Sequence, residues 1–295
     1  MDNKPLLPVK SDFVFKWIFG DQRNIDILEE FLKSFLDIPD DEYERLTIVD
    51  PHIKKESEND KFGILDIKIN TRSMSVIHIE IQLQVFPELK QRTIYGHSKL
   101  FTEQISSGQD WSVINRVITI IITDEIFIPD NSDYFNQFRY RTKNNTEFTN
   151  LSEIITIDLN KLPPKTDGTK LWEWTKFIKS SNEEDFQMLE QRNPQIKKAV
   201  AVLKELSADE RARMLFEAQE FARRDAVALM KKAKTEGWAE GKAEGKAEGK
   251  AEGKAEVVNS IVKNAINMGM DISDIVKITG LKHEEIQEML KDRFN

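Results

Sequence analysis

The stretch that decides the fold is a pair of segments, FGILDIKI at residues 62–69 and VIHIEIQLQ at residues 76–84. In both segments apolar and polar side chains alternate with a period of two, which is typical of a β-strand with two unlike faces. The segment NTRSMS at residues 70–75 separates them and contains turn-forming residues. The sequence therefore predicts an antiparallel hairpin.

Two acidic residues, Asp66 and Glu80, lie in the middle of these strands. An odd-length connection at residues 71–75 pairs residue 66 with residue 80, so both carboxylates project from one face with their β-carbons about 5 Å apart. Unpaired carboxylates so close repel each other, and a divalent cation relieves the repulsion. Mg²⁺ held by one or two carboxylates is a usual arrangement for handling phosphates. Gln82 points the same way as Glu80, so its amide could orient an attacking water or a scissile phosphate.

Further helices and strands are expected around the hairpin. Residues 24–36 and 89–106 carry apolar side chains at helical spacing. Residues 113–123 are apolar at almost every position, which is typical of a central strand covered on both faces, and residues 152–159 form another strand. We therefore expect an α/β domain over residues 1–168, with a mixed sheet flanked by helices.

Beyond residue 168 the sequence predicts only helices. We divide this part into a helical region at 169–235, a low-complexity repeat at 236–256 and a small helical module at 257–295. Helix formers without proline fill residues 195–240, which predicts one or two long helices. The side chains expected to be buried there are Leu203, Leu206, Met214, Leu215, Phe216 and Leu229.

The repeat places glycine at every fourth position in a GKAE pattern. Each glycine costs about 1 kcal/mol of helix propensity, so an isolated helix there should be marginal. Two interpretations remain open. The segment is either a flexible tether or a helix stabilised by a partner, with small-residue stripes that allow close approach in a homo-oligomer.

The C-terminal segment after Met270 predicts a helix, a turn at Gly280 and Leu281, and a second helix, with Asp271 or Ser273 as the cap. Such a pair can bind DNA or can be a small packing module. The second helix includes HEEIQEML at residues 283–290, whose glutamates would repel phosphates, and this favours the packing module.

Composition excludes several classes of protein. With 43 basic and 51 acidic residues the net charge is −8, which excludes a polybasic protein that binds nucleic acid by bulk charge. The absence of cysteine excludes disulfides, thiolate metal sites and cysteine nucleophiles, and the 4 histidines do not lie at metal-ligand spacing. There is no signal-peptide pattern and no membrane-spanning apolar run, so we expect a cytoplasmic protein without a membrane partner.

At this point the residues resemble a known family. SDFVFKWIFGD at residues 11–21, LDIKI at 65–69, VIHIEIQLQ at 76–84 and QRTIYGHSKLFTEQI at 91–105 are similar to the Rpn recombination-promoting nucleases, which are also described as transposases of PD-(D/E)XK type. The resemblance covers about residues 8–165, and the helical tail with its charged repeat is also similar.

The resemblance implies a restriction-endonuclease-like core and a metal-dependent DNA endonuclease that hydrolyses phosphodiester bonds. It implies Mg²⁺, with Mn²⁺ as a possible substitute, DNA as the partner, and a role in DNA recombination or mobile elements.

Carried over residue by residue, Asp66 and Glu80 match the metal-binding acids, and Gln82 occupies the position of the motif lysine. Leu65 stands where the general motif has proline, and Gln82 lacks the lysine charge. Lys68 is expected to face the same side as Asp66, so we hypothesise that it supplies the missing charge.

Two N-terminal residues are weaker candidates. Asp12 is expected either to support the metal site or to cap a helix that begins near Phe13. Lys16 is expected either to meet a phosphate or to pair with Asp12.

Other interpretations remain open. Asp66, Glu80 and Gln82 could be ordinary polar residues on a solvent-facing side of the sheet, and His78 on the same side is expected to be a surface histidine. The chain could also be a catalytically impaired nuclease fold that binds DNA or a protein. In a third reading, the helical tail is a transcriptional or assembly module and the N-terminal domain is its passenger.

Overall fold

The computed structural model describes residues 5–49 and 67–291 of the chain. For residues 290 and 291 it describes the backbone only. Contacts divide the chain into two compact units, residues 1–219 and residues 220–295. The division at residues 168, 235 and 256 stays a prediction.

A mixed sheet forms the centre of the first unit, with the strand order β1-β2-β3-β4-β6-β5. Strands β3, β4 and β6 run parallel, whereas β1, β2 and β5 pair antiparallel with their neighbours. The strands are β1 (Thr47–Val49), β2 (Ile67–Asn70), β3 (Val76–Gln82), β4 (Val117–Thr123), β5 (Phe135–Arg141) and β6 (Glu147–Asp158).

The predicted hairpin is confirmed where the structure describes it, because β2 and β3 pair antiparallel with Ile67 opposite Ile79. The predicted central strand is also confirmed, since β4 is buried at every position. Strands β1 and β5 were not predicted. Both are sheet edges, and β5 is largely exposed, so neither carries a strong apolar pattern.

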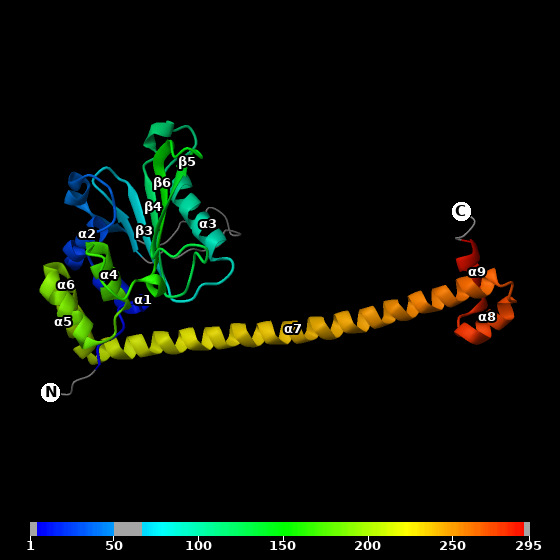
Figure 1. The fold of residues 1–295 in the computed structure, drawn as a ribbon. Helices are drawn as coiled ribbons and strands as arrows, with labels where there is room; N and C mark the ends of the chain where they lie inside the picture. Colours follow the sequence, from blue (N-terminus) through cyan, green and yellow to red (C-terminus); the bar gives the residue numbers. More distant parts are fainter. Residues whose placement is uncertain (1–4, 50–66, 292–295) are drawn as a thin grey trace. The chain divides into compact units, whose positions relative to one another are not determined.

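Helices cover both faces of the sheet (Figure 1). Helices α1, α2, α4 and α6 share one large core with the isoleucines of the sheet, and α3 lies on the opposite face. Helix α5 packs beside α4 and α6. These helices are α1 (Asp12–Phe19), α2 (Ile25–Lys33), α3 (Leu89–Thr102), α4 (Lys170–Lys179), α5 (Glu183–Arg192) and α6 (Pro194–Ala208). The predicted α/β fold with a mixed sheet flanked by helices is confirmed.

Aromatic rings join the helices of the large core. Phe19 of α1 lies 5.2 Å from the ring of Phe31 on α2 and 5.9 Å from the ring of Trp174 on α4, measured between centroids. Phe177 of α4 packs edge-on against Trp174 and against Phe186 of α5. Helices therefore close off the apolar face of the sheet, whereas His78 and Glu80 of β3 lie on the face that α3 covers.

Within residues 5–49 and 67–291, four short 3₁₀ helices connect the main elements. They are η1 (Gln22–Asn24), η2 (Asp40–Arg45), η3 (Trp111–Val113) and η4 (Leu159–Lys161).

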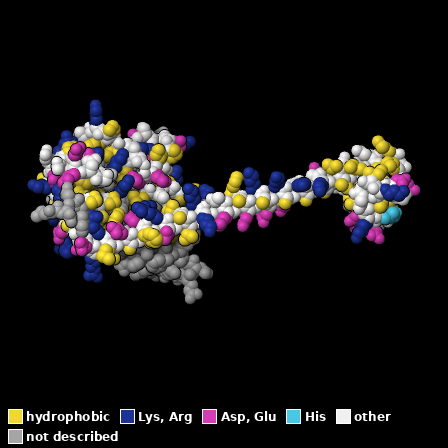
Figure 2. All heavy atoms as spheres, turned by 90° about the horizontal axis from the view of Figure 1, so that it is seen from below, with side chains coloured by type: hydrophobic (Ala, Val, Ile, Leu, Met, Phe, Trp, Pro, Cys, Tyr) yellow, Lys and Arg dark blue, Asp and Glu magenta, His cyan; other side chains and the backbone are white. Residues whose placement is uncertain are grey.

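A single helix, α7 (Glu210–Asn267), runs through the whole repeat, and the boundary between the two units falls within it. The flexible-tether interpretation is therefore wrong. Alanine, lysine and glutamate are strong helix formers and occupy three of every four positions, which offsets the cost of the glycines. Figure 2 shows basic and acidic side chains on different sides of this helix, as a four-residue period requires.

Part of the burial predicted for residues 195–240 is wrong. Leu203 and Leu206 of α6 are buried and Phe216 is partly buried, as expected. By contrast, Met214, Leu215 and Leu229 are exposed. The reason is that α7 contributes only Ala212 and part of Phe216 to the large core, so these three side chains have nothing in the described chain to cover them.

The second unit ends in the predicted helix pair, α8 (Ile272–Thr279) and α9 (His283–Lys291). Asp271 precedes α8, and Gly280 follows it with a φ of 71°, a left-handed conformation that favours glycine. Ile275 and Ile286 pack on Val262 of α7. Among the helices that the structure describes, none combines the length and apolar character needed to cross a membrane.

Candidate active site

Glu80 lies in the middle of β3, on the face of the sheet that α3 covers. The pairing of Lys68 with His78 and of Ile67 with Ile79 fixes the register of the hairpin, and it is the register that the sequence predicts. Glu80 itself pairs with Ile121 of the parallel neighbour β4. Asp66, the other predicted metal-binding acid, lies outside the described residues.

The face expected to meet solvent is buried. Glu80 is only 7% exposed and His78 only 2%, so the readings of Glu80 as a solvent-facing residue and of His78 as a surface histidine are both wrong. The cause is α3, which lies over this face with Leu89, His97 and Leu100 buried. Polar alternation along β3 reflects a polar interior rather than an exposed side.

His78 of β3 and His97 of α3 are both held neutral at the interface between the sheet and α3. Burial, together with nearby cationic groups, lowers the pKa of His78 to about 3, and its two ring nitrogens lack hydrogen-bond partners. Burial lowers the pKa of His97 to about 4. His97 Nδ1 lies 2.7 Å from Thr119 Oγ1 of β4, and Nε2 lies 2.9 Å from Ser152 Oγ of β6. His97 thereby ties α3 to two central strands.

Glu80 is paired with an arginine that sequence reasoning did not connect with it. Arg92 of α3 donates through Nη2 to Glu80 Oε1 over 2.7 Å. Burial raises the pKa of the Glu80 carboxyl, against the opposing pull of Arg92 and Lys16, and Asp12 raises it further. The alternation of β3 indicates which side Glu80 faces. The alternation does not indicate which turn of a covering helix lies above Glu80, so it could not predict the contact with Arg92.

Asp12 lies in the first turn of α1 and Lys16 in its last turn, close enough for their charges to act on Glu80. Lys16 Nζ lies 2.8 Å from Asp12 Oδ1, which confirms the predicted pair. Ser11, not Asp12, caps α1, because its side chain accepts the backbone N–H of Val14. The capping reading of Asp12 is therefore wrong, and its carboxylate pairs with Lys16 instead.

Lys68 is directed to α3 rather than to Glu80. Its Nζ lies 3.6 Å from Glu103 Oε2, and both side chains are largely buried. The structure therefore brings Arg92 to Glu80, and the catalytic role of Lys68 stays a prediction.

Gln82 is the last residue of β3 and is half-buried. Its backbone carbonyl accepts from the N–H of Asp124 over 3.2 Å, and Asp124 pairs with Lys10 over 2.7 Å. This ion pair at the end of β3 was not predicted, because it joins residues far apart in the sequence.

The donor chemistry at Glu80 fits a hard divalent cation. A buried carboxylate oxygen suits Mg²⁺ or Mn²⁺. At Glu80 that carboxylate charge is balanced by one half-exposed arginine, which a cation could replace. Among the described residues no cluster of three acidic or histidine side chains could hold a metal, so any such site also needs groups beyond them.

A family model described as a PD-(D/E)XK nuclease family transposase matches residues 9–233, which is more than half of the chain. The chain belongs to this PD-(D/E)XK family. The match confirms both the predicted family and the predicted core fold. No curated protein and no solved structure gives a match.

Membership of the PD-(D/E)XK transposase family supports a nuclease that acts on DNA. Nucleases of this superfamily generally use divalent metal ions.

Proposed function

We propose that this chain is a Mg²⁺-dependent DNA endonuclease that hydrolyses phosphodiester bonds, with Glu80 as a metal-binding acid. The observation that carries the proposal is the buried Glu80 carboxylate, held by an arginine on the α3 face of the sheet. A buried acid with a raised pKa and a single half-exposed arginine partner is typical of functional sites, where such perturbed groups cluster.

Asp66 is proposed as the second metal-binding acid. Ile67, which follows Asp66, pairs with Ile79, which precedes Glu80. If this antiparallel register continues by one residue, the two acids face each other on one side of the hairpin. Asp66 and Glu80 would then each supply a carboxylate oxygen to the metal ion from neighbouring strands.

The remaining residues have supporting roles. We propose that Gln82 positions the attacking water through its amide, and that Asp12 and Lys16 tune the charge around Glu80. Lys68 would contribute positive potential if its pairing with Glu103 opens. Arg92 has a side chain that is 53% exposed, so it can leave Glu80 and contact a DNA phosphate when a cation takes its place.

The chemistry that bound Mg²⁺ supplies is activation of water at neutral pH and stabilisation of charge that develops on the phosphate. Glu80 would hold that ion and exclude water from one side of it, because α3 covers the carboxylate. Mn²⁺ is the expected substitute. We also propose that the protein acts in DNA recombination or transposition and is located in the cytoplasm. We further propose that it forms a homo-oligomer through its C-terminal helices.

The test is nicking of supercoiled plasmid by the purified full chain, with and without Mg²⁺. We expect Glu80→Gln and Asp66→Asn to lower the rate by about a thousandfold, a loss typical of removing a group that stabilises a transition state. The matched control is Glu147→Gln on the exposed part of β6, which should cut like the unmodified protein.

Cleavage that persists in both acid variants would refute the assignment of the site. DNA binding without cleavage by the unmodified protein would refute the endonuclease proposal and favour the impaired nuclease fold.

A further inference from the structure

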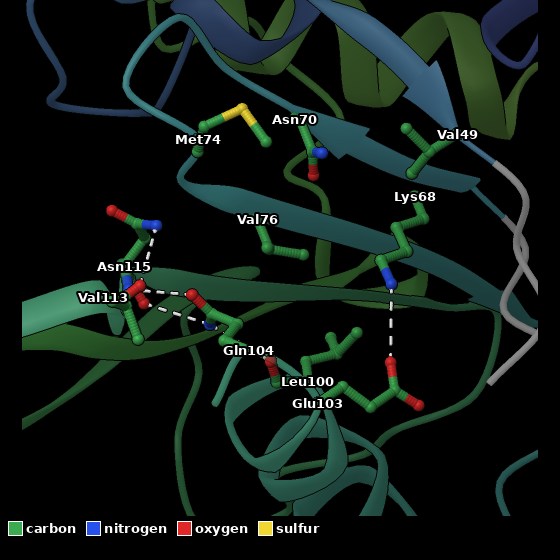
Figure 3. Close-up of a pocket in the computed structure, with 10 residues that line it drawn as sticks. All are labelled: Val49, Lys68, Asn70, Met74, Val76, Leu100, Glu103, Gln104, Val113 and Asn115. Carbon is green, nitrogen blue, oxygen red and sulfur yellow. Dashed lines mark hydrogen bonds and ion pairs between the residues drawn. The ribbon is translucent and has the colours of Figure 1, made fainter. Parts of the chain in front are cut away.

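A cavity of about 520 Å³ opens on the face of the sheet that carries Glu80, between the β1–β2 edge and the end of α3 (Figure 3). Val49 of β1, Val76 of β3 and Leu100 of α3 form apolar walls. A cavity of this volume is within the range of pockets that bind small organic groups.

The cavity also contains polar groups. Asn70 of β2 points into it, and its buried Oδ1 has no hydrogen-bond partner (Figure 3). Lys68 and Glu103 lie opposite each other at the other end, 3.6 Å apart. Because these two charges balance, the cavity suits a neutral ligand with a polar edge better than it suits a free phosphate.

The cavity lies on the same face of β3 as Glu80. Lys68 pairs with His78, and His78 lies two residues before Glu80 on the same face of β3. Val76 lies four residues before Glu80, which corresponds to about 13 Å along a strand. This is roughly the rise of four nucleotides along one strand of duplex DNA. One DNA strand can therefore reach both Glu80 and the cavity.

A nucleobase fits this chemistry. Its faces are apolar, its edge carries donors and acceptors, and the asparagine amide is a common partner for the edge of a base. A base stacked inside a duplex cannot enter such a cavity, whereas an unpaired or flipped-out base can.

An exposed tryptophan lies on the same short helix as one of the lining residues. Trp111 of η3 is 78% exposed, and Val113 of η3 lines the cavity. Exposed aromatic rings are stacking platforms for the bases of single strands. Trp111 is therefore suited to stack on a neighbouring unpaired base.

We propose that this cavity binds an unpaired nucleobase, so that the preferred DNA contains single-stranded or flipped-out nucleotides near the scissile phosphate. The inference rests on the proposed function for its substrate, but it concerns a separate group of residues and can be tested by binding alone.

The test uses the full chain carrying Glu80→Gln, so that no DNA is cut. Fluorescence anisotropy with one labelled oligonucleotide compares binding of the single strand with binding of its blunt duplex. We expect the single strand to bind about tenfold more tightly, and adding Asn70→Leu to weaken single-strand binding by about tenfold, in line with the loss of one base-edge contact. Duplex binding should not change. Asn144→Leu, in the exposed loop between β5 and β6, is the matched control.

Folding of the variants is checked by thermal unfolding. Asn70→Leu removes an unsatisfied buried oxygen, so its Tm should equal or exceed that of the parent. A second variant, Val49→Phe, narrows the cavity without changing the amide and should also reduce single-strand binding. Equal binding of single strand and duplex, or no effect of either variant, would overturn the proposal.

The two proposals fail in different ways. If Mg²⁺-dependent nicking requires Glu80 while Asn70→Leu binds like its parent, the cavity assignment is wrong and the nuclease stands. If the cavity variants lose single-strand binding while the unmodified protein never nicks DNA, the base site stands and the nuclease is wrong.

Discussion

Glu80 and Arg92 together set the electrostatics of the candidate site. The carboxylate is buried and the guanidinium is half-exposed. Arg92 can therefore move into solvent, and a cation can take its place at Glu80. A cation that binds Glu80 must compete with the arginine, and the strength of that competition is measurable.

Arg92→Gln should therefore bind Mg²⁺ more tightly than the unmodified protein, by about tenfold or 1.4 kcal/mol. Removing the guanidinium takes away a positive charge that repels the ion and occupies its ligand. The measurement is the rise in Tm on adding Mg²⁺, which follows the affinity of the folded state. Lys143→Gln, in an exposed loop, is the control for a lost positive charge. An equal rise for Arg92→Gln and for the unmodified protein would contradict the competition.

His97 makes stability depend on pH. Its folded pKa of about 4 lies below the ordinary value of 6.5, so the fold holds the ring neutral. The stabilisation is present above pH 6.5 and is lost as the pH falls from 6.5 towards 4, because the unfolded chain then binds the proton more readily.

Denaturant unfolding should show a loss of about 2 kcal/mol from this group between pH 7 and pH 5. His97→Gln keeps a polar side chain that does not titrate, so the loss of stability between pH 7 and pH 5 should be smaller in this variant by about 2 kcal/mol. A pH dependence that is the same in the variant and in the unmodified protein would assign the effect to other groups.

At this scale the sequence predicts part of the candidate site. The hairpin register and the Asp12–Lys16 pair follow from spacing alone. The partners of Glu80 and Lys68 do not, because Arg92 lies on α3 and Glu103 caps its end, and the position of α3 over the sheet depends on packing. The burial of His78 has the same cause.

Helix α4 connects three other helices within the large core. Its aromatic side chains meet those of α1, α2 and α5, so three helices depend on it for contacts. Sequence periodicity indicates that α4 has an apolar side, and the structure adds which helices that side meets. The edge strands β1 and β5 escaped prediction for the opposite reason, since they are short or largely exposed.

Phe177→Ala should lower the free energy of unfolding by about 3–5 kcal/mol, because it leaves a cavity among fully buried rings. Phe148→Ala on β6 changes a side chain that is 83% exposed, and should cost less than about 0.5 kcal/mol. Urea unfolding of the two variants compares them directly. A similar cost at both positions would show that α4 does not hold the core.

At the scale of the whole molecule, the two units separate the candidate chemistry from the helical tail. Every described candidate residue lies within residues 1–219, including Glu80, Arg92 and the cavity around Asn70. The family match extends to residue 233, a short distance into the second unit.

A chain ending at Gln219 should therefore fold and keep Mg²⁺-dependent nicking within about threefold of the full chain, since it retains the core and the candidate site. The measurement pairs a thermal melt with the plasmid assay. A folded but inactive fragment would show that the second unit takes part in DNA binding or catalysis, and an unfolded fragment would show that the boundary is misplaced.

The repeat within α7 determines how fast the backbone hydrogen bonds of this helix open. Glycine at every fourth position weakens a helix that has little tertiary packing along the repeat, and such segments sit at the low end of local stability. Backbone amides of residues 237–253 should exchange with deuterium within seconds, while those of β4 stay protected for hours. Slow exchange in the repeat of the full chain would show that another copy or partner covers it. The same helix would then report its own assembly through the rate at which its amides exchange.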